Sequence, residues 1–369
     1  MKKMKKVVGV LLCLTMVVML VACGSSGSGD SSDGSSKEGS SGKKIKIGVL
    51  LPNARGDNSI ADIMYGAVEA AQKDCDFEFD YAEGVEPTDY AQFLDEFASS
   101  GEYDLIIPGT FSYADAMAEL APQYPDQKFL FWDNNVETGM ENVWSAAFDK
   151  GQHSFLVGAF SALMDPYGEV ELNGKTYTWD PKSVVGIVSG VESPDTFWPC
   201  SAYWAGAKYV NPDIDCKYTT AGSWGDQAKC KELAISLYEQ GAAFVFQYLG
   251  AGVYGVVEAA EENDRFCFGF DLESNLEISP NVIAVPYNET NNVLSKLIKD
   301  FVENGTFKGD TVEIFGVDTG DQKIGYQEGA KIPEEVLQAM DEITEKVANG
   351  EIKIPRTFDE VEAFTDTYK

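Results

Sequence analysis

The chain of 369 residues has few positive charges for its size. It contains 28 Lys and Arg against 60 Asp and Glu, so its formal net charge at pH 7 is −32. Proteins that track nucleic-acid phosphates need a positive surface, so this balance argues against such a function. It also argues against membrane adhesion driven by charge alone. Anionic substrates would be repelled at long range, although a local pocket can override that repulsion.

Histidine and cysteine are too scarce for the common catalytic and metal-binding clusters. The one histidine, His153, precedes an apolar helical pattern, where a structural role is the simpler expectation. The seven cysteines form no CxxC motif, so a metal site is unsupported. Cys216 could form a disulfide with Cys200 or Cys230, but the simpler expectation is small buried side chains. We therefore expect no cofactor, no metal and no catalytic residues.

No apolar run reaches the roughly 20 residues that a membrane-spanning helix needs. The longest, residues 7–21, follows a Lys-rich start, which is typical of a signal peptide. The tetrapeptide Leu20-Val21-Ala22-Cys23 ends that run and resembles the lipobox of bacterial lipoproteins. We predict that residues 1–22 are a signal peptide and that Cys23 is lipidated. An ordinary signal peptide and an uncleaved anchor remain the alternatives.

Residues 24–42 consist almost entirely of Gly, Ser and charged residues. With no apolar side chain to bury, such a segment behaves as a flexible tether. About 19 residues at roughly 5–6 Å × √n give a mean reach of about 25 Å. We therefore assign residues 23–43 to a lipidated cysteine and a tether, and we expect an extracytoplasmic body anchored to the cell membrane.

From residue 45 onward, short apolar runs typical of strands buried on both faces alternate with helical patterns. The strand-like runs are 45–51, 104–108, 129–133, 183–189, 243–249, 266–271 and 282–287. The helical patterns are 58–71, 89–99, 114–123, 151–164, 203–209, 227–240, 254–263 and 290–304. This alternation indicates an α/β fold with parallel sheets, and two doubly wound lobes fit it better than a barrel does.

In open α/β sheets, ligands bind beyond the carboxyl ends of the strands. Here those ends carry small, polar or acidic residues, among them Thr110, Asp133 and Asp271, and few cations. Such a lining suits a neutral ligand rich in hydroxyl or ring N–H groups, and it suits phosphates poorly.

Residues 250–255 match the GxGxxG pattern, and Asp271 follows Gly250 by about 20 positions, as in dinucleotide-binding motifs. The late position of the motif and the extracytoplasmic body argue against a dinucleotide. Gly250 and Gly252 would still let backbone approach a ribose without phosphates at a helix N-terminus.

Several longer blocks stand in the order found in one known family: 113–116 (YADA), 124–129 (YPDQKF), 154–158 (SFLVG), 205–212 (AGAKYVNP), 222–229 (GSWGDQAK) and 250–260 (GAGVYGVVEAA). The body therefore resembles the basic membrane protein family of substrate-binding lipoproteins, which serve ABC importers of purine nucleosides. The resemblance implies a type I periplasmic-binding-protein fold, with two lobes joined by a three-crossover hinge and a ligand in the cleft. We expect a monomer whose lobes are residues 44–148 with 282–308, and 149–281 with 309–369.

The resemblance also implies binding residues. Residues 56–61 match a family motif of the type G-x-D-D-K-S-F-N, which gives Asp57 and Asn58 binding roles. Ile60 and Ala61 stand where the family has the Phe that stacks on the purine and an Asn. Trp224 stands at the second stacking aromatic, where the family commonly has Phe. Asp57 could instead cap the helix that follows it.

Two acids complete this implied site. Asp133 matches the family acid that bonds the base, and Asp271 matches the one that bonds the ribose. Asn288 stands where many members have a Lys that reaches the sugar. Phe111, Gly250 and Gly252 are the other predicted contacts. Simpler roles stay open: each acid could cap the next helix, Trp224 could pack on the surface, and Phe111 could belong to the core.

We favour a receptor that delivers its solute to an ABC permease and ATPase. A sensing receptor without transport, or a binder of riboflavin or a sugar, would use the same site. A nucleoside hydrolase is less favoured, because the chain has one histidine and no evident acid–base or metal cluster. The Pro-flanked Phe197 and Trp198 could form a cleft lid or pack within a loop.

Overall fold

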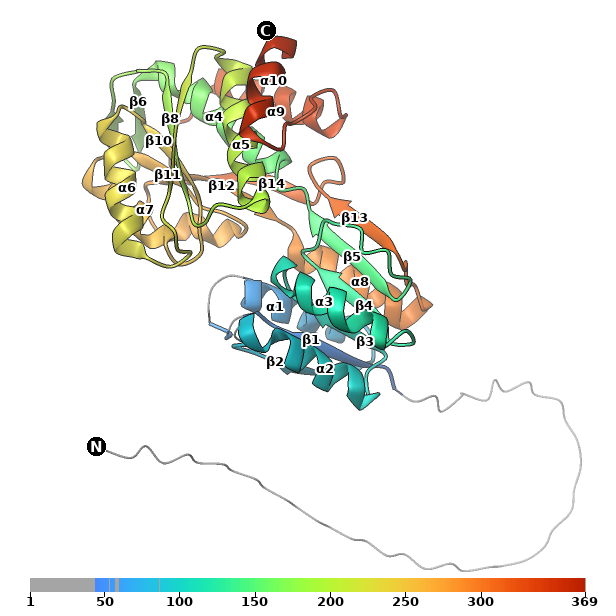
Figure 1. Cartoon of the computed structure of the whole chain (residues 1–369). Helices are drawn as coiled ribbons and strands as arrows, with labels where there is room; N and C mark the ends of the chain where they lie inside the picture. The colour runs from blue at the N-terminus through green and yellow to red at the C-terminus, as the bar shows by residue number, and fades with distance from the viewer. Residues whose placement is uncertain (1–43, 53, 57–59, 86, 369) are drawn as a thin grey trace, which may run out of the picture. The chain divides into compact units, whose positions relative to one another are not determined.

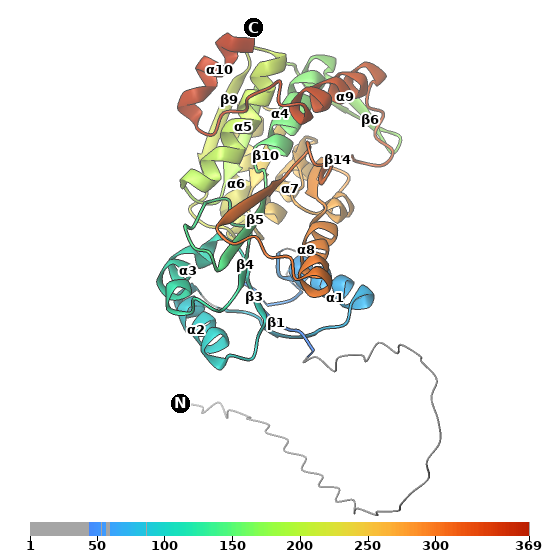
Figure 2. The same ribbon diagram turned by 90° about the vertical axis from the view of Figure 1, so that its right-hand side faces the viewer.

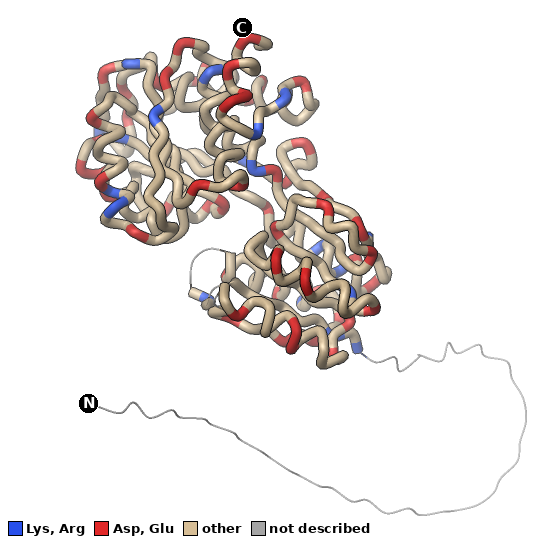
Figure 3. Tube along the Cα trace, viewed as in Figure 1, with Lys and Arg blue, Asp and Glu red and all other residues tan. Residues whose placement is uncertain are grey.

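The structure, a computed structural model, describes residues 44–52, 54–56, 60–85 and 87–368. The expected signal peptide, Cys23, the tether, Asp57 and Asn58 lie outside these residues. Lys44–Lys369 forms one compact unit (Figure 1). Among the described helices, none is both long and apolar enough to cross a membrane. Acidic residues are distributed along the chain in both halves of this unit (Figure 3).

The first lobe contains a six-stranded, fully parallel sheet in the order β13-β5-β4-β3-β1-β2. Helices α1 and α8 pack on one face of this sheet, and α2 and α3 on the other (Figure 2). The strands are β1 Lys46–Leu50, β2 Glu78–Ala82, β3 Leu105–Pro108, β4 Phe129–Trp132, β5 Val143–Phe148 and β13 Thr311–Phe315. The helices are α1 Ile60–Asp74, α2 Tyr90–Ser100, α3 Ala114–Leu120 and α8 Thr290–Asn304.

The second lobe contains a sheet in the order β14-β12-β11-β10-β8-β9, in which β14 alone is antiparallel. Helices α4, α5, α9 and α10 cover one face, and α6 and α7 cover the other. The strands are β8 Val184–Ser189, β9 Asp215–Thr220, β10 Phe244–Tyr248, β11 Phe266–Phe268, β12 Val282–Asn288 and β14 Gln322–Tyr326, with a separate hairpin of β6 Glu169–Leu172 and β7 Lys175–Thr178. The helices are α4 Gln152–Met164, α5 Pro194–Val210, α6 Gln227–Glu239, α7 Val253–Glu262, α9 Glu334–Ala348 and α10 Val361–Tyr368.

Three connections join the lobes, and they fall at residues 149–151, at Glu289 and at 316–321. The expected lobe boundaries are wrong at two strands. β12 pairs with β11 and β14, so it belongs to the second lobe, and β13 pairs with β5 in the first. An apolar run predicts a buried strand but not the sheet in which its backbone finds hydrogen-bond partners.

Helix α5 replaces the expected lid or loop around Phe197 and Trp198. Ser193 is its N-cap in a capping box with Thr196, and Pro194 occupies the first turn, where proline costs no hydrogen bond. Trp198 is buried within this helix. The helix therefore starts about nine residues before the predicted 203–209 pattern, because capping residues define its first turn.

Helices α4 and α5 approach closely at two glycines. A Cβ on Gly158 would lie 1.8 Å from the carbonyl oxygen of Tyr203, and one on Gly206 would lie 1.9 Å from that of Phe155. No larger residue fits at either position without moving a helix. This packing brings Lys150, just before α4, within reach of Asp195 in the first turn of α5.

Candidate functional site

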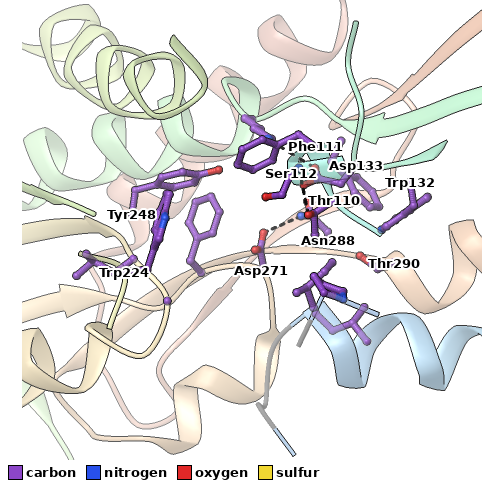
Figure 4. Close-up of a pocket in the computed structure, with 18 of the residues that line it drawn as sticks. Thr110, Phe111, Ser112, Trp132, Asp133, Trp224, Tyr248, Asp271, Asn288 and Thr290 are labelled. Carbon is purple, nitrogen blue, oxygen red and sulfur yellow. Dashed lines mark hydrogen bonds and ion pairs between the residues drawn. The ribbon is translucent and has the colours of Figure 1, made fainter. Parts of the chain in front are cut away.

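A cavity of about 410 Å³ opens at the carboxyl ends of the strands of both sheets (Figure 4). The first lobe contributes the segment after β3, the end of β4 and the start of α1. The second contributes the segments after β9, β10 and β11. The lining residues are Pro52, Ile60, Ile63, Pro87, Tyr90, Thr110, Phe111, Ser112, Trp132, Asp133, Phe148, Lys150, His153, Trp224, Tyr248, Leu249, Gly250, Phe270, Asp271, Asn288 and Thr290.

Most of the described residues that we predicted for the site line this cavity. They are Ile60, Phe111, Asp133, Trp224, Gly250, Asp271 and Asn288. Gly252 does not line it: a Cβ there would lie 2.8 Å from the sulfur of Cys230. The backbone N–H groups of Gly250 and Gly252 both donate to the Trp224 carbonyl oxygen. The GxGxxG segment therefore holds the loop that carries Trp224.

Aromatic rings form the second lobe's wall of the cavity. The ring centroids of Trp224 and Tyr248 are 6.1 Å apart, and those of Tyr248 and Phe270 are 5.0 Å apart, both in edge-to-face arrangements. Trp224 lies against the backbone of Gly190 and is 38% exposed. Figure 4 shows Phe111 across the cavity from Trp224. A flat ring entering the cavity would therefore meet aromatic surface.

Asp271 follows β11 and has a left-handed backbone, with φ of 64°. The Asn288 side-chain amide donates to its Oδ1 at 2.9 Å, and the Asn288 oxygen accepts from Gln322 Nε2 at 2.9 Å. The next helical turn begins at Glu273 without a side-chain cap, so Asp271 is not a helix cap. Burial, with the nearby charge of Asp133, raises the pKa of Asp271 to about 7, although Lys150 opposes this.

Asp133 follows β4 and also has a positive φ, of 57°. Its Oδ1 lies 3.6 Å from Lys150 Nζ. Burial raises the pKa of Asp133 above its usual range, while the Lys150 ammonium opposes that rise. Two carboxylates, one from each lobe, thus face the same cavity.

Lys150 is a cation that the sequence analysis missed. Its ammonium lies 2.9 and 3.0 Å from the two carboxylate oxygens of Asp195 and 4.7 Å from the centre of the Phe111 ring. Burial lowers its pKa, but Asp133, Tyr248 and Asp195 outweigh burial and raise the pKa of Lys150 above its usual range. Lys150 is the one cation among the described lining residues, and it was missed because β5, which leads to it, was not predicted.

His153 also lines the cavity, and its ring lies 4.9 Å from that of Phe270. Within the described part of the chain, neither ring nitrogen makes a hydrogen bond of good geometry, although the Lys150 backbone lies close enough to favour the charged form of the ring. Burial, with the Lys150 charge, lowers the pKa of His153 to about 3, so the imidazole is neutral near pH 7. The structural role expected for this histidine therefore does not include satisfied hydrogen bonds.

The described cysteines are all free, so neither disulfide considered for Cys216 is present. Cys200, Cys230 and Cys267 are buried, as expected for small apolar side chains. In the described residues, no group of three or more His, Cys, Asp or Glu side chains is placed to hold a metal ion.

Two doubly wound sheets, three crossings and a cavity at the strand ends define a type I periplasmic-binding-protein fold. The fold recurs in the crystal structure of an ABC transporter solute-binding protein from Aeropyrum pernix K1, with a TM-score of 0.72 and 21% identity. That match covers 87% of this chain and 98% of that chain. The predicted fold class is confirmed.

Residues 44–357 match the Bmp family model, described as PnrA-like ABC transporter substrate-binding protein, and the chain belongs to this family. An uncharacterized lipoprotein of Pyrococcus abyssi is 26% identical in an alignment of 366 positions, which covers 87% of each chain. Basic membrane protein A of Borreliella afzelii is 22% identical, over 86% of this chain and 94% of that protein. The resemblance expected from the sequence blocks is confirmed, and the protein is an ABC-type substrate-binding protein.

Proposed function

We propose that this protein is an extracytoplasmic, lipid-anchored receptor for a purine nucleoside-like ligand, which it delivers to an ABC permease and its ATPase. The observation that carries the proposal is the pair of acids facing one cavity from opposite lobes. Asp133 lies at the end of a first-lobe strand and Asp271 at the end of a second-lobe strand. A ligand with hydrogen-bond donors at both ends would join the two walls.

A purine nucleoside has the matching chemistry. Its base offers ring or exocyclic N–H donors for Asp133, and its ribose offers hydroxyl donors for Asp271. The base would stack on Trp224, and base–aromatic stacking is worth about 1–3 kcal/mol. Closure of the lobes about the three connections would remove water from these hydrogen bonds and present a closed face to the permease.

Two positions qualify the choice of ligand within this class. Ile60 lines the cavity from α1, so the first lobe supplies no aromatic ring at that point. Asn288 donates to Asp271 and accepts from Gln322, so its side chain orients the acid and does not reach out as a lysine would. Both support a ligand that stacks on Trp224 and is held by two acids, with its ribose hydroxyls bound directly to the oriented carboxylate.

The anchor completes the proposal. Cys23 would carry the lipid after removal of residues 1–22, and residues 23–43 would tether a monomeric body. Relatives named as lipoproteins support this assignment. A sensing receptor without transport would use the same site, and neighbouring genes for a permease and ATPase, or for a sensor kinase, would discriminate the two.

A thermal-shift screen of residues 44–369, which form one compact unit, tests the ligand. The panel contains inosine, guanosine, adenosine, their free bases, riboflavin and simple sugars. A ligand at 100 times its dissociation constant adds about 2.7 kcal/mol of stability, which shifts the melting temperature clearly. A shift with a purine nucleoside supports the proposal. A response confined to riboflavin or a sugar would contradict a nucleoside ligand but would still support the function of a solute receptor.

A further inference from the structure

Lys150 introduces a buried positive charge into a cavity whose other charged side chains are acids. Its side chain is 8% exposed, and it lies in the connection between β5 and α4, where the chain crosses between lobes. Charged groups almost never lie this deep unless they are paired. The residues that pair with Lys150 therefore indicate the function of its charge in the cavity.

Those partners come from both lobes. The Asp195 carboxylate, in the first turn of α5, accepts from the ammonium at 2.9 and 3.0 Å. From the first lobe, Asp133 lies 3.6 Å away, and the Phe111 ring faces the ammonium. Tyr248, the neutral His153 and Asp271 also lie close enough to interact with its charge.

We propose that Lys150 is a specificity-determining residue of the ligand site. Its ammonium pairs with Asp195 and offsets part of the charge of Asp133, so the subsite formed by Asp133 and Phe111 attracts an organic cation less than a bare carboxylate would and takes an uncharged hydrogen-bond donor, such as a ring N–H. Without Lys150, two carboxylates would stand beside an aromatic ring, which is the arrangement that recognises a cationic ligand. The ligand part of this inference rests on the proposed nucleoside function.

The test compares guanosine with 7-methylguanosine at about pH 6. The methylated base carries a positive charge at this pH but keeps the N–H groups of its pairing edge. Isothermal titration calorimetry on residues 44–369 gives the ratio of the two dissociation constants for the wild type and for Lys150→Met. In the wild type we expect guanosine to bind more tightly. In Lys150→Met we expect the affinity for 7-methylguanosine relative to guanosine to rise by about 10–100-fold. The reason is that the variant lacks the positive charge that repels the cationic base at a distance of several Å.

A matched control keeps the cavity intact. Lys296→Met removes an exposed lysine that pairs with Asp300 on α8, and it should leave the ratio unchanged. If Lys150→Met does not fold, the double variant Lys150→Met/Asp195→Asn removes one charge of each sign and still leaves Asp133 without its cation.

A second measurement needs no ligand. Carboxyl ¹³C NMR of protein labelled at Asp, assigned with Asp133→Asn, gives the titration midpoint of Asp133. Loss of Lys150 should move it upward by about one pH unit or more. An unchanged midpoint, or equal losses of affinity for both nucleosides, would overturn the role of Lys150. If neither nucleoside binds the wild type, the proposed ligand is wrong, and an Asp133 midpoint that Lys150→Met leaves unmoved would still overturn the charge balance on which this inference rests.

Discussion

Asp133 and Asp271 hold equivalent places on the two walls of the cavity, yet different partners balance their charges. Each follows a parallel strand with a positive φ, which turns the chain at the strand end. Asp133 faces an ammonium, whereas Asp271 receives an amide N–H from Asn288. A full charge offsets the burial of a carboxylate better than a dipole does. We therefore expect the pKa of Asp133 to be raised less than that of Asp271.

The largest expected effect comes from Asp133→Asn. This isosteric change removes a charge-assisted acceptor for the base and leaves Lys150 with one carboxylate partner fewer. Hydrogen bonds to charged groups contribute about 1.5–3 kcal/mol, so we expect about 100-fold weaker binding of guanosine and of guanine alike. Calorimetry with both ligands is the measurement. If only guanosine lost affinity, Asp133 would contact the sugar, and the assignment of base and sugar to the two acids would be reversed.

Trp224→Ala should have the next largest effect, because it removes stacking from the second wall. We expect binding to weaken about 10–100-fold, in line with the stacking energy of one base on one aromatic ring. Tyr254→Ala is the control, since Tyr254 is 41% exposed and lies outside the cavity lining. Fluorescence or calorimetric titration measures both variants. Unchanged binding in Trp224→Ala would remove this residue from the site.

Most of the fold follows from the sequence, because its central strands are buried on both faces. The strands β1, β3, β4, β8, β10, β11 and β12 all lie within or across the predicted runs. The missed strands include β2 and β9 at sheet edges, where alternating polar residues weaken the apolar signal. β5 was missed although it is wholly buried, since Ser145, Ala146 and Ala147 weaken the strand signal of its run.

The walls of the site were predictable to different degrees. Asp133 and Asp271 end predicted strand-like runs and Trp224 lies within a matched block, so the sequence indicated that they are near the cavity. Lys150 and Asp195 were missed because their pairing depends on how α4 and α5 pack, which Gly158 and Gly206 permit. Contacts between segments far apart in the chain leave no local sequence pattern. The sequence therefore did not predict that the Lys150 ammonium lies beside these carboxylates.

Asp271→Asn should weaken nucleosides about tenfold near pH 8 and leave free bases unaffected. The carboxylate is the form that accepts two hydroxyl hydrogen bonds, and the pKa of Asp271 is raised to about 7. In the wild type, nucleoside affinity should therefore rise as the pH rises through about 7, and fall below it. The variant should show no such dependence. Calorimetry between about pH 5.5 and 8.5 measures these affinities. If bases and nucleosides lost equal affinity in the variant, Asp271 would not contact the ribose.

The same substitution should act on the unliganded protein. An acid whose pKa is raised on folding binds its proton more tightly in the folded state, so its contribution to stability falls as the pH rises from about 4 toward 7. Asp271→Asn removes this penalty and keeps an oxygen for the Asn288 amide. We expect its melting temperature to exceed that of the wild type at about pH 8, and the two to converge at about pH 4. A constant difference would mean that Asp271 does not titrate in this range.

The smallest expected effect comes from Asn288→Ala, which removes the amide that favours the charged form of Asp271. The pKa of Asp271 should rise further, so the pH midpoint of nucleoside binding should move upward, with only about a threefold loss of affinity well above that midpoint. Asn292→Ala is the control, because its amide donates to Glu289, which does not line the cavity. A midpoint that stays in place would show that burial alone sets the proton affinity of Asp271. The difference between the pKa values of Asp133 and Asp271 would then depend on Lys150 beside Asp133 and not on the Asn288 amide beside Asp271.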